Sequence, residues 1–154
     1  KVLVGPNSNT GEWGHNPWPE RMVGVDSCSC GRFATGCVET WLNGAALVRD
    51  YTALGVDTDK VEAFEVNARA EAGEARAIQA IGDYGRRLAM ALAGVINVLD
   101  PDVIVLGGGL SGVSLLYDLV PRLWGEYANI SVPKTQLVCA KFGSDSGVRG
   151  AAWL

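Results

Sequence analysis

The sequence lacks any apolar run long enough to cross a membrane. Its longest strongly apolar stretch, Leu88 to Leu99, has twelve residues, including the polar Asn97, whereas a membrane-spanning helix needs about 20. The N-terminal residues also lack the apolar segment of about 7–15 residues that marks a secretory signal. We therefore expect no membrane partner and a cytoplasmic location.

Positive charge is scarce as well. Thirteen Lys and Arg residues stand against 17 Asp and Glu residues, so the formal net charge is −4 at pH 7. A surface of this sign does not attract the phosphates of nucleic acid or of an anionic membrane. We therefore expect no nucleic acid as the main partner.

Glycine, in contrast, is abundant, with 20 of the 154 residues, whereas an average protein has about 7%. The glycines follow neither a collagen repeat nor a low-complexity block, so we expect tight turns at several specific places. A chain of this length is expected to form one domain.

The apolar pattern predicts helices alternating with strands after an irregular segment that ends near Cys37. Helices are expected over Val38–Tyr51, Lys60–Ala70 with Asp59 as its cap, Glu74–Leu99, Val113–Tyr127 with a kink near Pro121, and Val148–Leu154. Strands are expected within Lys1–Asn7, which runs into a turn, over Val103–Leu106, and over Gln136–Ala140. The run Val103–Leu106 is typical of a strand buried on both faces. This order predicts an α/β fold with a largely parallel sheet.

Three of the four cysteines lie close together, at Cys28, Cys30 and Cys37, and the only histidine, His15, lies a short way upstream. Disulfides are not expected in a reducing compartment. Three cysteines and one histidine are a ligand set of structural zinc, and a bound ion would stabilise a loop that buries no core of its own. The alternative is a group of reduced, buried cysteines beside an incidental histidine. Cys139, within a strand pattern, is expected in the core.

Several motifs in order resemble those of one family. They are GEWGHNP at residues 11–17, Cys28-x-Cys30-Gly31, Gly36-Cys37-Val38-Glu39-Thr40, DPDVIVLGGG at residues 100–109 and GVRGAA at residues 147–152. Together they closely resemble the signature of the ROK family of bacterial sugar kinases and repressors, and HNPWP is most similar to the fructokinase branch. The resemblance covers essentially the whole chain and implies an α/β fold of the actin-like or ribonuclease-H-like type.

The resemblance implies roles for individual residues. Glu12 and Glu39 match sugar-contacting glutamates, and His15 matches a residue that both ligates zinc and touches the sugar. The zinc cysteines correspond to Cys28, Cys30 and Cys37. Ionised carboxylates suit sugar hydroxyls because charge-assisted hydrogen bonds are strong. The alternatives are a solvated loop acid for Glu12 and an acid that balances a helix dipole for Glu39.

The turn Gly107, Gly108 and Gly109 matches the adenosine side of the family's nucleotide site. Its bare backbone, after a strand and before a helix, would let a nucleotide approach closely. The alternative is a plain strand-to-helix turn. A dinucleotide-binding oxidoreductase is not expected, because no acid is suitably placed after this turn.

The sequence departs from the family pattern in two ways. Six residues separate Cys30 from Cys37, where the family usually has four, and we keep Cys37 as a ligand because a longer surface loop costs little entropy. The family's D-x-G-x-T motif, its aspartate general base and its GTG-x-GGG stretch are absent. The chain also starts without methionine, so we expect a cut or processed start, a general base in a missing N-terminal part and no kinase activity in the isolated chain.

We therefore expect the C-terminal lobe of an ATP-dependent hexose kinase, most like a fructokinase. Residues 1–40 are expected to bind sugar and structural zinc, and residues 41–154 to form the parallel-sheet core on the nucleotide side. The expected partners are a hexose such as fructose, Mg-ATP and a second copy in a homodimer. The alternative is the sugar-sensing domain of a ROK repressor, but the intact DPDVIVLGGG run favours the kinase.

Overall fold

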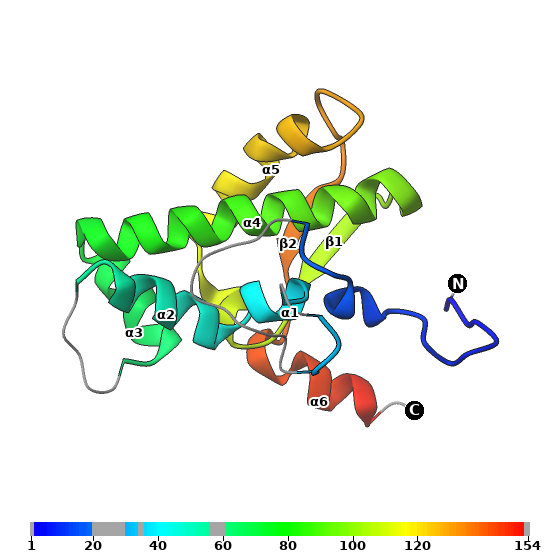
Figure 1. Ribbon diagram of the computed structural model, residues 1–154, viewed down its shortest axis with the longest axis horizontal. Coiled ribbons are helices and arrows are strands. Elements are labelled where there is room, and N and C mark those ends of the chain that lie inside the picture. Colours follow the sequence, from blue (N-terminus) through cyan, green and yellow to red (C-terminus); the bar gives the residue numbers. More distant parts are fainter. Residues whose placement is uncertain (1, 20–29, 34–35, 56–60, 153–154) are drawn as a thin grey trace. The chain divides into compact units, whose positions relative to one another are not determined.

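The computed structural model describes residues 2–19, 30–33, 36–55 and 61–152. The chain forms two compact units, Lys1–Asn43 and Gly44–Leu154, which we call unit 1 and unit 2. Their helices and strands are shown in Figure 1. Each unit is described by itself.

Unit 1 is organised around one closure of the chain. A short 3-10 helix, η1 (Glu12–His15), and a short α-helix, α1 (Val38–Trp41), lie at its two ends. An antiparallel bridge joins Pro17 to Cys37 between them. The backbone N–H of Trp18 donates to the carbonyl of Gly36 at 3.1 Å, and that of Val38 donates to Asn16 at 2.9 Å.

Two buried indole rings support this closure. Trp18 and Trp41 are only 3% and 2% exposed, and their ring centroids lie 6.3 Å apart in a tilted arrangement. Tilted aromatic pairs at this separation are attractive beyond the apolar area that they bury. The rings therefore stabilise a unit that contains little regular secondary structure.

The strand expected within Lys1–Asn7 is not formed over its described residues. Val2 to Gly5 are irregular, and the side chains of Val2 and Val4 are 84% and 85% exposed. A strand needs a neighbour for its backbone N–H and C=O groups. No described part of the chain pairs with this segment, so its β-branched pattern alone does not produce a strand.

The single helix expected over Val38–Tyr51 is also wrong. The structure has two helices here, α1 and α2 (Gly44–Ala53), separated at Leu42 and Asn43. Leu42 has a non-helical backbone, with φ −127° and ψ 43°. Asn43 and Gly44 are poor helix formers, and they outweigh the helical spacing of the apolar residues on either side.

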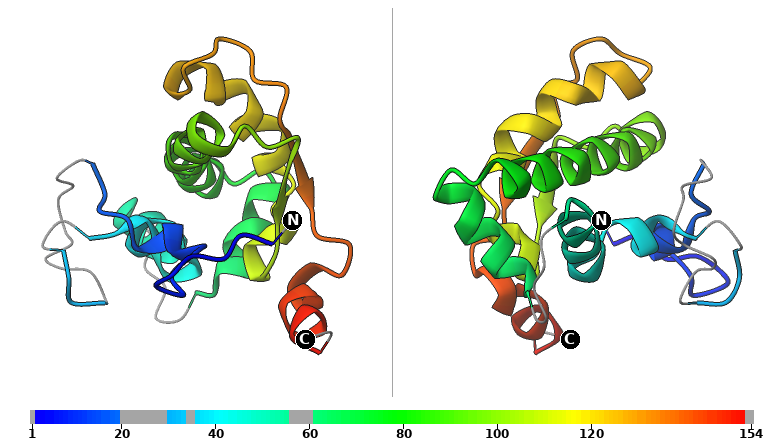
Figure 2. Two further views of the ribbon diagram at one scale, coloured as in Figure 1. Left: turned by 90° about the vertical axis from the view of Figure 1, so that its right-hand side faces the viewer. Right: turned by 60° about the vertical axis from the view of Figure 1, so that its left-hand side comes forward.

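Unit 2 is built around one long helix. Its elements are α2, α3 (Ala63–Glu71), α4 (Ala75–Leu99), β1 (Val103–Leu106), η2 (Gly109–Gly112), α5 (Leu115–Tyr127), β2 (Gln136–Cys139), η3 (Gly143–Asp145) and α6 (Ser146–Ala151). α4 packs against α5, α2 and α3, and the views in Figure 2 show α5 running alongside it. None of the described helices combines the length and apolar character needed to span a membrane.

α4 buries much of the apolar stripe that its periodicity predicts. Ile81, Leu88 and Leu92 are buried, whereas Ile78 and Leu99, near the helix ends, are 44% and 55% exposed. Burial of such side chains contributes roughly 1.5–3 kcal/mol each. The stripe is therefore effective where α4 is flanked by other helices and ineffective at its ends.

Arg87 of α4 is buried, although it is charged. It is 9% exposed, and its guanidinium forms an ion pair with Asp50 of α2. A second arginine, Arg49, reaches the same carboxylate at 3.4 Å. Buried charges are tolerated when they are paired, so this ion pair links α2 to α4 inside the helical layer.

The start of α3 differs slightly from the expected one. The helix begins at Ala63, and Glu62 precedes it as the N-cap residue. The backbone N–H of Glu62 donates to the Glu65 carboxylate at 2.8 Å, which satisfies one donor at the start of the helix. The expected cap, Asp59, lies outside the described residues.

The two strands of unit 2 are parallel, as expected, and pair in register from Val103 with Gln136 to Leu106 with Cys139. The expectation that β1 is buried on both faces is wrong, because Val103 and Val105 are 44% and 57% exposed. Cys139 is exposed rather than in the core. In this register Val103 and Val105 share one face of the sheet, whereas Cys139 lies on the opposite face with Leu106.

A substitution at Gly125 tests how closely α5 packs against the segment that follows it. A Cβ atom at this position would lie 2.1 Å from the backbone oxygen of Ser131, so the backbone would have to move. We expect Gly125→Ala to lower the free energy of unfolding of the chain by ~1–3 kcal/mol, measured by urea denaturation.

Gly94→Ala is the matched control. It lies in α4, and a Cβ atom there meets nothing within 4 Å. Alanine is the better helix former, so this variant should gain up to ~1 kcal/mol. Equal unfolding midpoints for the two variants would contradict the close packing at Gly125.

Candidate functional site

Unit 1 brings three of the residues singled out in the sequence together. The Nε2 atom of His15 lies 3.6 Å from a carboxylate oxygen of Glu12. The Nδ1 atom of the same ring lies 3.8 Å from a carboxylate oxygen of Glu39. The imidazole therefore lies between two carboxylates, those of Glu12 and Glu39, that are 27 positions apart in the sequence.

Local structure positions each of these side chains. Glu12 and His15 are both on η1, which follows Gly11 in a left-handed conformation with φ 97°, where glycine is the least strained residue. Glu39 lies in the first turn of α1. That turn is fixed by Thr40, whose hydroxyl accepts a hydrogen bond from the backbone N–H of Cys37 at 3.2 Å.

The closure of unit 1 determines how near η1 and α1 approach. A Cβ atom added to Gly14 would lie 3.7 Å from the Cβ atom of Glu39, so the two elements are close enough for one added methyl group to reach van der Waals contact. The side chains of Glu12 and Glu39 remain 54% and 52% exposed. Their carboxylates can accept hydrogen bonds from a polyhydroxyl ligand without the full desolvation cost of buried charges.

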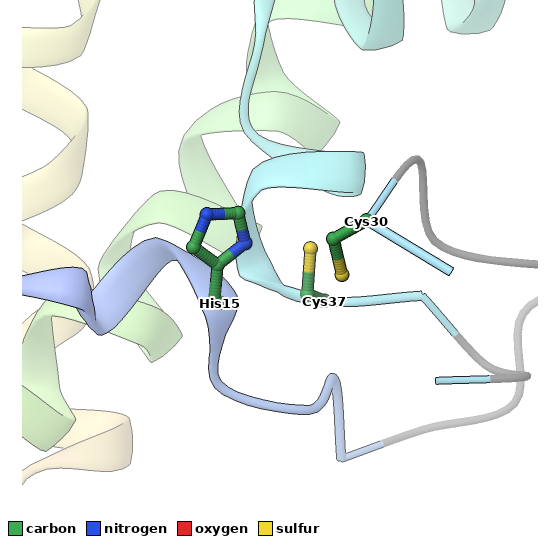
Figure 3. A group of neighbouring side chains, drawn as sticks. All are labelled: His15, Cys30 and Cys37. Atoms are coloured by element: carbon green, nitrogen blue, oxygen red, sulfur yellow. The ribbon is translucent and has the colours of Figure 1, made fainter. Parts of the chain in front are cut away.

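The same histidine takes part in a second cluster. One ligand atom each of His15, Cys30 and Cys37 lies within 4.8 Å of the others. Figure 3 shows the three side chains, which come from three separate segments of unit 1. The fourth expected ligand, Cys28, lies outside the described residues.

The chemistry of this cluster fits a zinc ion. Sulfur and imidazole nitrogen are the ligand types of structural zinc. The Nδ1 atom of His15 is buried and has no hydrogen-bond partner among the described residues, and such an atom is costly unless a ligand or an ion occupies it. Figure 3 shows this ring nitrogen on the side of the two cysteines.

One feature of the cluster differs from expectation. Cys30 is in a disulfide in this structure, although disulfides are not expected from the sequence, while Cys37 is a thiol. Cys30 can ligate zinc only as a thiolate, so reduction must come first.

The glycine turn lies in unit 2, directly after β1. Gly108 has φ 81° and ψ −172°, a conformation that is accessible essentially to glycine alone. A Cβ atom on Gly108 or Gly109 would meet nothing within 4 Å. Among the described residues, none therefore fills the space beside Gly108 and Gly109, and their backbone can be approached by a ligand.

Two side chains that the sequence did not single out brace this turn. The Ser111 hydroxyl donates to the carbonyl of Gly108 at 2.7 Å. The phenol of Tyr117 donates to the carbonyl of Ser111 at 2.6 Å. Burial, together with a hydrogen bond to Cys139, raises the pKa of Tyr117 well above the usual range of a phenol, so it stays protonated as a donor. No periodicity marks Ser111 or Tyr117, because both act across a turn.

Comparison with known proteins places this geometry in context. The ROK family model matches residues 1–154. An N-acetyl-D-glucosamine kinase of Photobacterium profundum is 33% identical over 99% of this chain and 52% of its own length. The chain spans about half the length of the curated relatives that it matches.

Solved structures give the same family. A ROK family glucokinase from Streptomyces griseus, in complex with glucose and AMPPNP, has a TM-score of 0.81 and 25% identity, covering 99% of this chain and 53% of that one. A ROK family transcriptional regulator, a homologue of the E. coli MLC protein, has a TM-score of 0.74 and 28% identity, covering 99% and 40%.

These neighbours confirm the expected α/β class, with an actin-like ATPase fold. The family match extends over every residue of the sequence. The chain therefore belongs to the ROK family.

Proposed function

We propose that this chain is the sugar-binding and nucleotide-binding lobe of an ATP-dependent hexose kinase. The observation that carries the proposal is the convergence of Glu12, His15 and Glu39 on one partly exposed surface. The relatives support it, since they include an N-acetyl-D-glucosamine kinase and a glucokinase in complex with glucose and AMPPNP.

The residues of unit 1 would orient the acceptor sugar. Glu12 and Glu39 accept hydrogen bonds from hydroxyl groups, and two acceptors fixed on separate elements restrict how a ring can rotate. Phosphoryl transfer depends mainly on such positioning and on charge stabilisation. We assign the general base to a part of the protein other than residues 1–154.

The residues of unit 2 would hold the donor nucleotide. The open turn of Gly107, Gly108 and Gly109 lies at the carboxyl end of a parallel strand, which is the usual ligand edge of such sheets. Ser111 and Tyr117 keep the turn in one conformation. As expected from the sequence, we propose that residues 1–40 bind sugar and zinc. Residues 41–154 would form the part that binds Mg-ATP.

We further propose structural zinc at His15, Cys28, Cys30 and Cys37. When bound, the ion would link η1 to the start of α1, because both elements would contribute ligands to it. Coordination by Nδ1 of His15 would leave Nε2 with its proton, so this nitrogen could donate to Glu12 or to a sugar hydroxyl. A neutral histidine in this role orients the ligand and does not act as a base.

The identity of the hexose and the oligomeric state are finer parts of the proposal. Fructose is predicted by the HNPWP stretch at residues 15–19, whereas the reported relatives are an N-acetyl-D-glucosamine kinase and a glucokinase. A homodimer is predicted from the resemblance. Phosphorylation rates with fructose, glucose and N-acetyl-D-glucosamine, measured in parallel on the protein as encoded, decide among the sugars.

A second candidate function is supported by one specific neighbour. The transcriptional regulator matches 99% of this chain, so the same lobe also occurs in a protein that is not described as a kinase. In this alternative, sugar binding would change DNA binding by another part of the protein. Sugar-dependent DNA binding without sugar phosphorylation would favour the regulator.

Replacing the carboxylates tests the sugar site. Glu39→Gln and Glu12→Gln each remove one charged acceptor, so each should weaken hexose binding by roughly 10- to 100-fold, as measured by calorimetry on the protein as encoded. Glu126→Gln, at an exposed position of α5, removes the same charge elsewhere and should leave the affinity unchanged. Wild-type affinity in both site variants would contradict the proposed role.

Zinc content tests the metal site. Protein purified under reducing conditions is expected to contain about one zinc ion per chain, and Cys37→Ser should lose it, because three remaining ligands do not close a structural site. Elemental analysis after dialysis measures the ion. Cys139→Ser, which alters an exposed cysteine of β2, serves as the control and should keep its zinc. Equal zinc content in the two variants would reject the site.

A further inference from the structure

Two basic side chains lie over an exposed aromatic ring that follows β2. Phe142 is 49% exposed. The guanidinium carbon of Arg149, from α6, lies 4.4 Å from the centroid of its ring, and the Nζ atom of Lys141 lies 5.7 Å from it. Cations at these distances are attracted by the face of an aromatic ring. The three side chains, which we call the Phe142 cluster, therefore combine a flat apolar surface with positive charge.

The backbone of the Phe142 cluster is well fixed. The N–H of Gly143 donates to the carbonyl of Ala140 at 2.9 Å, and the N–H of Asp145 donates to the carbonyl of Phe142 at 3.1 Å. These two turns lead directly from β2 through η3 into α6, as Figure 1 shows. The ring is therefore presented by consecutive hydrogen-bonded turns.

The Phe142 cluster is beside the glycine turn. The N–H of Ala140 donates to the carbonyl of Leu106 at 2.8 Å, and a Cβ atom on Gly107 would lie 3.9 Å from the Cβ atom of Ala140. η2, which contains Gly109, packs against η3. The two parallel strands thus place the open turn and the aromatic ring at one edge of the sheet, within the same unit.

We propose that Phe142 is the stacking surface for the base of the donor nucleotide, with Arg149 and Lys141 attracting its phosphates. Every nucleobase has a π face that stacks on aromatic side chains, and a polyphosphate gains from two nearby cations. A neutral sugar would gain nothing from those two charges. The proposal rests on the proposed function, because it takes the glycine turn as the nucleotide site.

The binding of two ligands tests the proposal in the protein as encoded. Mg-ADP carries a base, whereas inorganic tripolyphosphate carries only the phosphates. Phe142→Leu keeps apolar bulk but removes the ring, so it should weaken Mg-ADP binding at least ~5-fold and change tripolyphosphate binding less than about 2-fold. Phe142→Tyr should restore Mg-ADP affinity. Calorimetry measures the dissociation constants of both ligands for the wild-type protein and for each variant.

Arg149 and a distant aromatic residue complete the set of variants. Arg149→Met removes the charge and should weaken both ligands. Tyr127→Leu is the control. Tyr127 is the last residue of α5 and precedes the amino end of β2, whereas Phe142 follows its carboxyl end, so this variant should leave both affinities unchanged.

Three outcomes would overturn the proposal. Unchanged Mg-ADP affinity in Phe142→Leu would show that the ring does not contact the base. If Phe142→Leu weakened the binding of Mg-ADP and of tripolyphosphate equally, the variant would have disturbed the local structure of this sheet edge, and stacking on the base would not explain the loss. Failure of the wild-type protein to bind Mg-ADP at all would reject the nucleotide site of the proposed function itself, and this result is distinguishable from the other two.

Discussion

The candidate sugar site depends on one closure of the backbone, where the segment around Pro17 returns against the segment around Cys37. Two backbone hydrogen bonds and the packing of Trp18 on Trp41 stabilise it. Without this closure η1 and α1 would be independent short helices, and helices of one turn are not stable alone in water. With it, Glu12 and Glu39 lie on either side of one imidazole ring.

The cysteines belong to the same closure of the backbone. Cys37 is the residue of the antiparallel bridge and also precedes α1. A zinc ion bound there would connect the bridge to His15, and a disulfide at Cys30 would constrain the loop in a different way. Both states reduce the conformational freedom of a loop that has little apolar core.

In unit 2, a sheet with only two described strands leads into the glycine turn. α4 supports this unit through apolar burial and through the ion pair between Arg87 and Asp50. The exposed face of β1 leaves Val103 and Val105 in solvent. Exposed apolar side chains on an ordered sheet are typical of an interaction surface.

Much of the secondary structure of unit 2 was predictable, because it depends on local pattern. The apolar period of α4 and the β-branched run of β1 are signals that neighbouring residues carry by themselves. The start of α3 and the break between α1 and α2 were less predictable. They depend on capping and on weak helix formers, whose effects compete with periodicity over only a few residues.

The sequence by itself determined which chemical groups this protein has: two glutamates, a histidine and clustered cysteines in one segment, and three consecutive glycines after a strand. Only the tertiary structure decided which of them meet. It placed Nε2 and Nδ1 of His15 toward different glutamates, buried Arg87, exposed Cys139 and packed η3, which follows Phe142, against η2 of the glycine turn. The physical reason is that these contacts join residues far apart in the chain, and no local pattern encodes the closure that brings them together.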